Sequence, residues 1–386
     1  MPPDLDALMD RALALARRGQ GHVSPNPQVG CVVVDDGGAV VGEGWHARSG
    51  GSHAEANALD AARDAGCDLT RATVVVTLEP CAHTGKTPPC AGLLVREGVR
   101  RVVVGMRDPF PRVDGRGIER LRAAGIEVTV GVRAAACARL VEAFTTHVRT
   151  GRPLVTLKVA QTLDGFAATN GGDSRWVTGE TARRRVHELR AASDAVLVGS
   201  GTARADDPAL TLRHGVTGPA PLRVVLDRAG TLPQTLRLFT DGAAPTVAVV
   251  AEGVVPAYAD DFMQHGGAVL ALPERGGHLD LGALLDRLGI GTAHPGPDAP
   301  GRRPVQSLLV EAGPRLAAAL LAADLVDVLH VFVAPKLLGA GRIALPGLAA
   351  ARMDDARTWA EAEWEPLGRD VLLTARRAAP ASNSSS

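Results

Sequence analysis

Aromatic residues and net charge are both nearly missing from this sequence. Aromatic side chains make up 3% of the 386 residues, and acidic and basic residues balance to a formal net charge of zero. Proteins that bind RNA or DNA usually present a basic surface, often with aromatic side chains on which bases stack. The composition therefore predicts no nucleic-acid partner, although a local basic site remains compatible with it.

Long apolar runs and a paired set of cysteines are also absent. No run approaches the roughly 20 apolar residues that a helix needs to cross a bilayer. Residues 1–18 form an amphipathic pattern without the apolar centre of a signal peptide. Five cysteines, an odd number in a chain of this length, argue against a disulfide scaffold. We therefore expect no membrane partner and a reducing, cytoplasmic location.

Lysine is almost absent, because the 42 basic residues comprise 39 arginines and three lysines, Lys86, Lys158 and Lys336. Arginine evidently serves wherever a generic positive charge suffices. A lysine that persists in such a sequence either meets a need for a compact ammonium group or is retained by chance. Both interpretations stay open for Lys336, to which the sequence assigns no chemistry.

Apolar residues, which make up 46% of the chain, recur in strand-like and helix-like segments that alternate along its length. This alternation predicts layered α/β folds. The expected elements include strands at 73–78 and 222–226 and a helix at about 133–149. Gly and Pro interrupt the pattern near 149–153, where a new apolar strand begins. We expect a first domain at 1–149, a second at 150–378, and a small, polar, disordered tail at 379–386. The Gly- and Pro-rich stretch 292–304 is expected to be a surface loop.

The first candidate site combines His53 and Glu55 with Cys81 and Cys90. One imidazole and two thiolates are ligands that zinc prefers, and a three-ligand set leaves a position for water, as in catalytic sites. Zinc activates such a water as a nucleophile at neutral pH. A carboxylate must then carry protons from that water to a leaving amine, and Glu55 stands two residues from a ligand. The pattern predicts a zinc-dependent deaminase.

Eight residues separate the two cysteines, whereas the general nucleobase-deaminase pattern has two. The inserted loop contains His83 and Lys86, which would suit a phosphate-bearing substrate. Simpler interpretations are ordinary core cysteines, or a structural zinc site with His83 as the fourth ligand. The other three cysteines lack ligand-like neighbours and are interpreted as structural: Cys31, Cys67 and Cys137.

The second half lacks the G-x-G-x-x-G pattern of a Rossmann domain, since Gly199-Ser200-Gly201 is followed by Arg204 where a third glycine would stand. A better dinucleotide feature is the turn 311–315, between an expected strand and helix. Gly313 allows close approach of the backbone, and Pro314 suits the first position of a helix whose free N–H groups can hold phosphate. Such turns are also common without any ligand.

These motifs closely resemble the bifunctional deaminase/reductase family of riboflavin biosynthesis. The long cysteine spacing is itself a feature of that family. The resemblance covers essentially the whole chain except the tail, and it rests on the segments 25–33, 42–46, 53–55, 77–90, 106–109, 115–117, 149–153, 163–165, 206–211, 310–314 and 334–339.

The resemblance implies a cytidine-deaminase-like α/β/α sandwich followed by an α/β domain like dihydrofolate reductase. It also implies two consecutive reactions. The first is hydrolytic deamination of 2,5-diamino-6-ribosylamino-4(3H)-pyrimidinone 5′-phosphate, and the second is NADPH-dependent reduction of the ribosyl group to a ribityl chain. The cofactors would be Zn²⁺ and NADPH, and the partner a small phosphorylated pyrimidine.

Residue roles follow from the same resemblance. In the deaminase half, His53, Cys81 and Cys90 would bind zinc, Glu55 would shuttle protons, and the residues near the substrate would be Asn26, His46, His83 and Lys86. In the reductase half, the positions expected at NADPH are Ala160, Trp176, Thr202, Asp206, Arg228, Gly313, Pro314 and Arg315. Those expected at the substrate are Lys158, Ser174, Arg190, Leu210, Arg213 and Glu311.

Three other functions are compatible with parts of the sequence. A tRNA or nucleoside deaminase with an accessory domain is disfavoured by the charge balance and the few aromatics. A structural zinc domain joined to a nucleotide sensor would have no use for Glu55 beside a ligand. A degenerate reductase half would leave deamination alone. Oligomeric state is not determined, although apolar strands near the C-terminus could form the edge of a homo-oligomer through the reductase domain.

Overall fold

The computed structural model describes residues 4–82, 89–291 and 303–377. The chain divides into two compact units, Met1–Gly151 and Arg152–Ser386. The division lies two residues beyond the position expected from the sequence. Most of the expected loop at 292–304 and the expected tail lie outside the described residues. None of the helices in the described ranges has the length and apolar character to span a bilayer.

The first unit is built on a five-stranded sheet with strand order β2-β1-β3-β4-β5. β1 runs antiparallel to both of its neighbours, whereas β3, β4 and β5 are parallel. The central strands are valine-rich and buried on both faces, as expected of a sheet covered by helices on each side. The strands are β1 Gly30–Val34, β2 Val40–Trp45, β3 Thr73–Leu78, β4 Arg101–Met106 and β5 Glu127–Val130.

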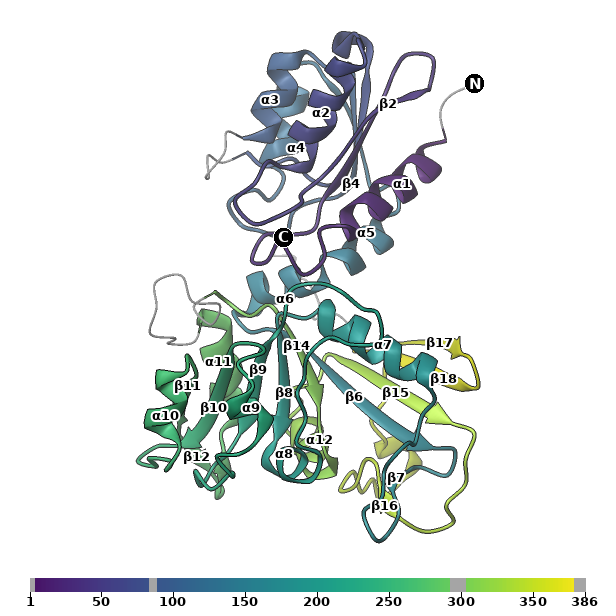
Figure 1. The fold of residues 1–386 in the computed structure, drawn as a ribbon. Helices are drawn as coiled ribbons and strands as arrows, with labels where there is room; N and C mark the ends of the chain where they lie inside the picture. The colour runs from purple at the N-terminus through teal and green to yellow at the C-terminus, as the bar shows by residue number, and fades with distance from the viewer. Residues whose placement is uncertain (1–3, 83–88, 292–302, 378–386) are drawn as a thin grey trace. The chain divides into compact units, whose positions relative to one another are not determined.

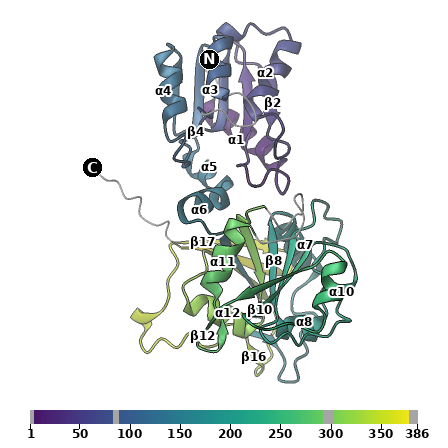
Figure 2. The ribbon, with the colours of Figure 1, turned by 90° about the vertical axis from the view of Figure 1, so that its left-hand side faces the viewer.

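Helices cover both faces of this sheet, which confirms the expected α/β/α sandwich (Figures 1 and 2). One face packs against α1 (Leu5–Arg17) and α5 (Ala134–Leu140). The other packs against α2 (Ala54–Asp64), α3 (Cys90–Glu97) and α4 (Arg116–Ala123).

Two glycines of β2 bring α2 unusually close to the sheet. A Cβ atom at Gly42 would lie 2.2 Å from the carbonyl oxygen of Ala58, and one at Gly44 would lie 2.3 Å from that of Ala54. Larger residues at these positions would therefore push the helix away. The start of α2 carries two of the candidate site residues, so these glycines help to set the position of the site.

One expected helix in the first unit was wrong. The sequence predicts a single helix over 133–149, but the structure has α5 and then α6 (Glu142–Thr150). The two meet at Val141, whose φ of −107° and ψ of 23° are not helical. The Val141 side chain is buried, and a β-branched residue gains little from helical geometry, so local packing ends the first helix there.

The second unit contains a nine-stranded sheet with order β11-β10-β9-β8-β14-β6-β15-β18-β17. The seven strands from β11 to β15 are parallel, and β18 and β17 add an antiparallel edge. The strands are β6 Leu154–Thr162, β8 Ala195–Gly199, β9 Leu222–Leu226, β10 Thr246–Ala251, β11 Ala268–Leu272, β14 Ser307–Glu311, β15 Val328–Ala334, β17 Glu361–Leu367 and β18 Asp370–Arg376.

Helices again lie on both faces of the sheet (Figure 1). α11 (Leu281–Ile290) and α12 (Pro314–Ala322) share one core with it. On the other face lie α7 Glu180–Ala191, α8 Ser200–Asp206, α9 Arg237–Thr240 and α10 Ala259–Gln264. Short pairs complete the unit: β7 Phe166–Ala168 with β16 Arg342–Ile343, and β12 Glu274–Arg275 with β13 His278–Leu279.

This topology places many of the candidate reductase residues at one edge of the second sheet. In a parallel sheet the carboxyl ends of the strands lie on the same side, and ligands of open α/β sheets bind there. The residues that follow or end these strands include Thr162, Gly199, Asp227, Glu311 and Ala334. Most of the residues assigned to the reductase lie at or near this edge.

Candidate active sites of the two units

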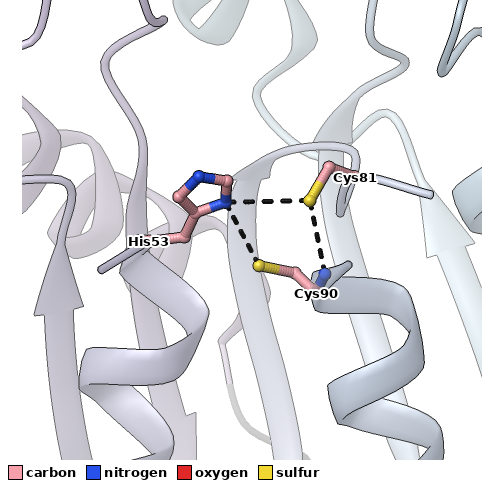
Figure 3. Close-up of side chains that lie close together, drawn as sticks. All are labelled: His53, Cys81 and Cys90. Atoms are coloured by element: carbon pink, nitrogen blue, oxygen red, sulfur yellow. Dashed lines mark hydrogen bonds between the residues drawn. The ribbon is translucent and has the colours of Figure 1, made fainter. Parts of the chain in front are cut away.

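The three candidate zinc ligands come from three separate elements (Figure 3). His53 is the N-cap residue of α2, and Cys90 is the first residue of α3. Cys81 lies in the loop that follows β3, and its carbonyl oxygen accepts a hydrogen bond from the N–H of Ala91. Helix N-termini favour negative charge, so both thiols lie where a thiolate is stabilised.

The ligand atoms of these residues converge. His53 Nδ1 lies 3.7 Å from Cys81 Sγ and 3.3 Å from Cys90 Sγ, and all three ligand atoms fall within 4.8 Å of one another. Zinc at tetrahedral angles and ordinary bond lengths would hold nitrogen and sulfur about 3.6 Å apart. The donor set and its spacing therefore fit a zinc ion. His83, the alternative fourth ligand, lies outside the described residues.

The two thiols and the imidazole of this cluster interact electrostatically. Hydrogen bonds from Cys90 and His53 lower the pKa of Cys81 to about 4, and the same interaction raises that of Cys90. The Cys90 N–H also donates to Cys81 Sγ over 3.3 Å. Zinc would bind both cysteines as thiolates.

Glu55 lies beside the ligands, buried near the start of α2. Burial raises the pKa of its carboxyl to about 7, and the neighbouring Cys81 adds to the rise. The Glu55 side chain is 3% exposed and interacts with Cys90. The predicted proton-transfer group is therefore placed within the cluster, away from bulk water.

Two of the residues expected near the deaminase substrate also belong to this cluster. The buried His46 lies with its ring 5.3 Å from that of His53, and its Nε2 is 3.1 Å from Asn26 Nδ2. Its Nδ1 lies 3.0 Å from the carbonyl oxygen of Ser52. A neutral imidazole satisfies both contacts, with Nδ1 donating and Nε2 accepting, and burial lowers the His46 pKa. His83 and Lys86 lie outside the described residues.

The candidate reductase substrate residues form a charged cluster at the carboxyl edge of the second sheet. Arg190 of α7 and Glu311 of β14 form a two-pronged ion pair in which Arg190 Nη2 lies 2.9 Å from Glu311 Oε2. Arg190 also donates to the carbonyl oxygen of Thr211 over 3.0 Å. Lys158 pairs with Glu311 in the β6–β14 register, and burial lowers its pKa. A lysine in this apolar strand therefore faces a carboxylate.

Arg213 and Leu210 lie on the segment that passes this cluster. The N–H of Arg213 donates to Nδ1 of the buried His187 over 3.0 Å. Leu210 is buried and adopts a φ of +51°, an uncommon conformation for a branched side chain. Ser174 is half-buried on the loop before α7. Its predicted role stays a prediction.

The residues expected at the cofactor divide into two groups. Thr202 and Gly313 come together from the turns after β8 and β14, since a Cβ at Gly313 would lie 3.2 Å from Thr202 Oγ1. Gly313 is the N-cap of α12 and Pro314 occupies its first turn, as predicted. A backbone cradle of this kind at a helix N-terminus fits a dinucleotide phosphate. Ala160 and Arg315 lie on β6 and in α12.

The remaining cofactor residues are exposed. The Trp176 ring is 63% exposed and stacks with Arg183, whose Cζ is 4.6 Å from the ring centre. Asp206 lies 3.9 Å from Arg175, and Arg228 forms an exposed ion pair with Glu274 at 2.8 Å. The Arg228 side chain is thus already engaged by a carboxylate in this structure.

Two residues that the sequence left without a role have defined contacts. Lys336 Nζ donates to the carbonyl oxygen of Trp176 over 2.6 Å, which links it to the expected cofactor residues. Both interpretations of Lys336 stay open. Glu79 is buried next to the loop that carries Cys81, and in the sequence it stands directly after a buried apolar strand, within the segment 77–90.

Both units match known protein families. Residues 3–106 match the cytidine and deoxycytidylate deaminase zinc-binding region, and residues 153–373 match the RibD C-terminal domain. The riboflavin biosynthesis protein RibD of Escherichia coli strain K12 is 42% identical over 382 residues, which span 95% of this chain and 97% of that protein. RibD of Aquifex aeolicus is 38% identical, with 96% and 97% covered. The chain belongs to the RibD family.

Solved structures agree over the full length. A diaminohydroxyphosphoribosylaminopyrimidine deaminase/5-amino-6-(5-phosphoribosylamino)uracil reductase from Thermotoga maritima superposes with a TM-score of 0.83 at 37% identity, covering 97% of this chain and 99% of that one. RibD of Acinetobacter baumannii gives 0.80 at 35% identity, with the same coverage. The chain is thus a bifunctional riboflavin-biosynthesis enzyme with a zinc-dependent deaminase and an NADPH-dependent reductase. The expected fold class is confirmed for both units.

Proposed function

We propose that the first unit hydrolyses the 2-amino group of 2,5-diamino-6-ribosylamino-4(3H)-pyrimidinone 5′-phosphate, and that the second reduces the ribosyl group of the product to a ribityl chain. The observation that carries the proposal is the convergence of His53, Cys81 and Cys90 around one point, with the buried carboxylate of Glu55 beside them. A structural zinc site has no use for that carboxylate.

In the deaminase unit, His53 Nδ1 and the two thiolates would hold zinc. The bound zinc supplies an activated water molecule for attack on the carbon that bears the amine. Glu55 would accept a proton from that water on a carboxylate oxygen and deliver it to the departing nitrogen. Asn26 and His46 would orient the pyrimidine, because their hydrogen bond fixes both side chains beside the ligands. We also assign substrate contacts to His83 and Lys86.

In the reductase unit, NADPH supplies the hydride. The turn at Gly313, Pro314 and Arg315, together with Thr202, would bind the cofactor phosphates through backbone N–H groups. The other proposed cofactor contacts are Ala160, Trp176, Asp206 and Arg228. Arg190 and Arg213 would bind the substrate phosphate, with Glu311 and Lys158 near the ribosyl group. Ser174 and Leu210 complete the proposed substrate contacts.

The test uses the purified full-length chain with zinc present. The pyrimidinone substrate is incubated with and without NADPH, and products are identified by mass spectrometry. We expect an amine to be replaced by oxygen in both samples, and two hydrogens to be added only with NADPH. The absence of the first change in a zinc-replete sample would reject the proposed substrate. The first change alone would reject an active reductase.

We also propose that the enzyme works in the cytoplasm and as a homo-oligomer formed through the reductase unit. Exposed apolar side chains in that unit, among them Trp364 of the edge strand β17 and Leu337, support an oligomer. Analytical ultracentrifugation of the full chain tests this, and a monomer at micromolar concentration would contradict it.

A further inference from the structure

The buried carboxylate of Glu79 has an unusual set of partners. Its Oε2 accepts hydrogen bonds from the N–H groups of Asp108 and Gly115, at 3.1 and 2.9 Å. Its Oε1 accepts from the N–H groups of Gly117 and Ile118, at 2.9 and 3.2 Å. The side chain is 3% exposed. A buried charge is stable only when it is well paired, and here four backbone donors pair it.

Three of these donors belong to the start of α4. Gly115 is the N-cap residue of that helix, and Gly117 and Ile118 lie in its first turn. Gly115 has no side chain with which to cap the helix, and its φ of +91° suits glycine. Glu79 therefore supplies, from a distant part of the chain, the acceptor and negative charge that a helix N-terminus favours.

The contact between the two segments is also sterically tight. A Cβ at Gly117 would lie 2.0 Å from the carbonyl oxygen of Pro80 and 3.1 Å from Glu79 Oε1. The N–H of Glu79 meanwhile donates to the carbonyl oxygen of Met106, at the end of β4. The segment 108–118 is thus clamped against the two residues that directly precede Cys81.

This contact matters because Cys81, unlike the other two candidate ligands, does not lie at the start of a helix that would fix its position. His53 and Cys90 lie at the starts of α2 and α3, so each is fixed by a helix. Cys81 lies in a loop, held on one side by the N–H of Ala91 from α3. On the other side its backbone is held through Glu79 and Pro80.

We propose that Glu79 is a positioning residue of the deaminase, which fixes Cys81 in its zinc-binding position by fastening the β3 loop to the N-terminus of α4. The inference rests on the proposed function, in which Cys81 is a zinc ligand. It gives a role to two sequence motifs that the reaction itself does not use, at 106–109 and 115–117. Groups that orient metal ligands commonly change metal affinity or activity by about 10- to 100-fold when removed.

The test variant is Glu79→Gln in the full-length chain. Glutamine keeps the size of the side chain but replaces one acceptor oxygen with an NH₂ group, which would face two backbone N–H groups. We expect zinc affinity, measured by competition with a chromogenic chelator, to fall about 10- to 100-fold. The absorption spectrum of the cobalt-substituted protein should shift, because the Cys81 thiolate moves. Deaminase kcat should fall with little change in KM, and reductase activity of the same molecules should persist.

A second variant keeps Glu79 intact and attacks the same contact. Gly117→Ala places a methyl group against the Pro80 carbonyl oxygen, so it should shift the cobalt spectrum and weaken zinc binding in the same direction. If Glu79→Gln does not fold, this variant decides the question.

The matched control is Asp227→Asn. Asp227 is a buried carboxylate of the reductase unit that accepts hydrogen bonds from the N–H groups of Thr231 and Leu232. It should leave zinc affinity and the cobalt spectrum unchanged.

Wild-type zinc affinity and an unchanged cobalt spectrum in both Glu79→Gln and Gly117→Ala would overturn the inference while leaving the proposed function intact. A wild-type chain that binds no zinc, or binds zinc without deaminating the substrate, would instead overturn the proposed function. The two failures are therefore distinguishable in one set of measurements.

Discussion

One carboxylate of each unit, Glu79 and Glu311, illustrates two different ways of pairing a carboxylate inside the protein. In the deaminase unit, Glu79 is satisfied by four backbone N–H groups. In the reductase unit, Glu311 is satisfied by the guanidinium of Arg190 and lies near the ammonium of Lys158. A backbone N–H group cannot move away from its carboxylate unless part of the chain unfolds, whereas an arginine side chain can exchange one partner for another.

The difference in how the two carboxylates are paired bears on how each unit binds its ligand. The deaminase cluster already holds its three candidate ligand atoms within 4.8 Å of one another, as a metal centre requires. In the reductase cluster Glu311 already pairs with Arg190. If Arg190 binds the substrate phosphate as proposed, the phosphate has to compete with Glu311, and we expect substrate binding to rearrange this ion pair.

The largest effect is expected from Cys90→Ala. Removing one of three ligands should abolish stoichiometric zinc binding and reduce deamination to background, while reduction of the deaminated intermediate continues. Zinc content by atomic absorption and separate assays of the two steps provide the measurement. A simultaneous loss of reductase activity would show that the units do not operate independently.

Glu55→Gln should separate metal binding from proton transfer. The variant should retain zinc, because Glu55 is not one of the ligands, and should lose deamination by about 10²- to 10⁴-fold. Ammonia release and zinc content are measured on the same sample. Retention of near-wild-type deamination would show that another group carries the proton.

Glu311→Gln tests the reductase cluster. A buried arginine left without its carboxylate should destabilise the unit by about 3 kcal/mol in urea unfolding, and reductase turnover should fall. The matched control is Asp327→Asn, which breaks another two-pronged pair of this unit, with Arg152 at 2.7 Å. That control should also destabilise the unit but should preserve turnover by the folded protein. Equal loss of turnover in both variants would reduce the role of Glu311 to stability.

His330 predicts a pH dependence confined to the second unit. Burial, together with the positive charges of Arg185 and Arg376, lowers its pKa to about 4. An unfolded histidine titrates near 6.5, so between pH 6.5 and 4 the unfolded chain binds a proton that the folded chain does not. Stability should therefore fall as the pH falls through this window, by up to about 3 kcal/mol. Urea unfolding of His330→Gln should show a shallower slope, and parallel slopes would contradict the assignment.

The smallest effect is expected from Arg228→Ala. Its exposed ion pair with Glu274 should contribute less than about 1 kcal/mol to stability. If Arg228 contacts a cofactor phosphate, the KM for NADPH should rise several-fold. Glu274→Ala, which frees Arg228, should not raise that KM. An unchanged KM in Arg228→Ala would remove this residue from the cofactor site.

The convergence of His53, Cys81 and Cys90 could be predicted from the sequence because its chemistry is carried by residue types with few other uses in this pattern. One histidine, one glutamate and two cysteines were enough. The role of Glu79 could not be predicted, since its partners are backbone N–H groups between 29 and 39 residues away, and backbone groups leave no trace in a sequence. The pairing of Arg190 with Glu311 spans 121 residues and depends on the strand order of the sheet.

The secondary structure was likewise predicted in some parts of the chain and missed in others. Apolar strands buried on both faces were predicted closely, and Thr73–Leu78 and Leu222–Leu226 match the structure at both ends. The hairpin of β17 and β18 was missed, because β17 is exposed along most of its length and contains Pro366. An edge strand of this kind lacks the apolar alternation on which sequence interpretation depends.

The scarcity of lysine has a practical consequence for chemical footprinting. Amine-acylating reagents find few targets in a chain where arginine takes nearly every cationic position. Lys158 is enclosed beside Glu311, and Lys336 donates to the carbonyl oxygen of Trp176, so both amines lie among residues assigned to the reductase ligands. Mass-spectrometric labelling of these two amines would therefore read out occupancy of the reductase site directly, without any turnover.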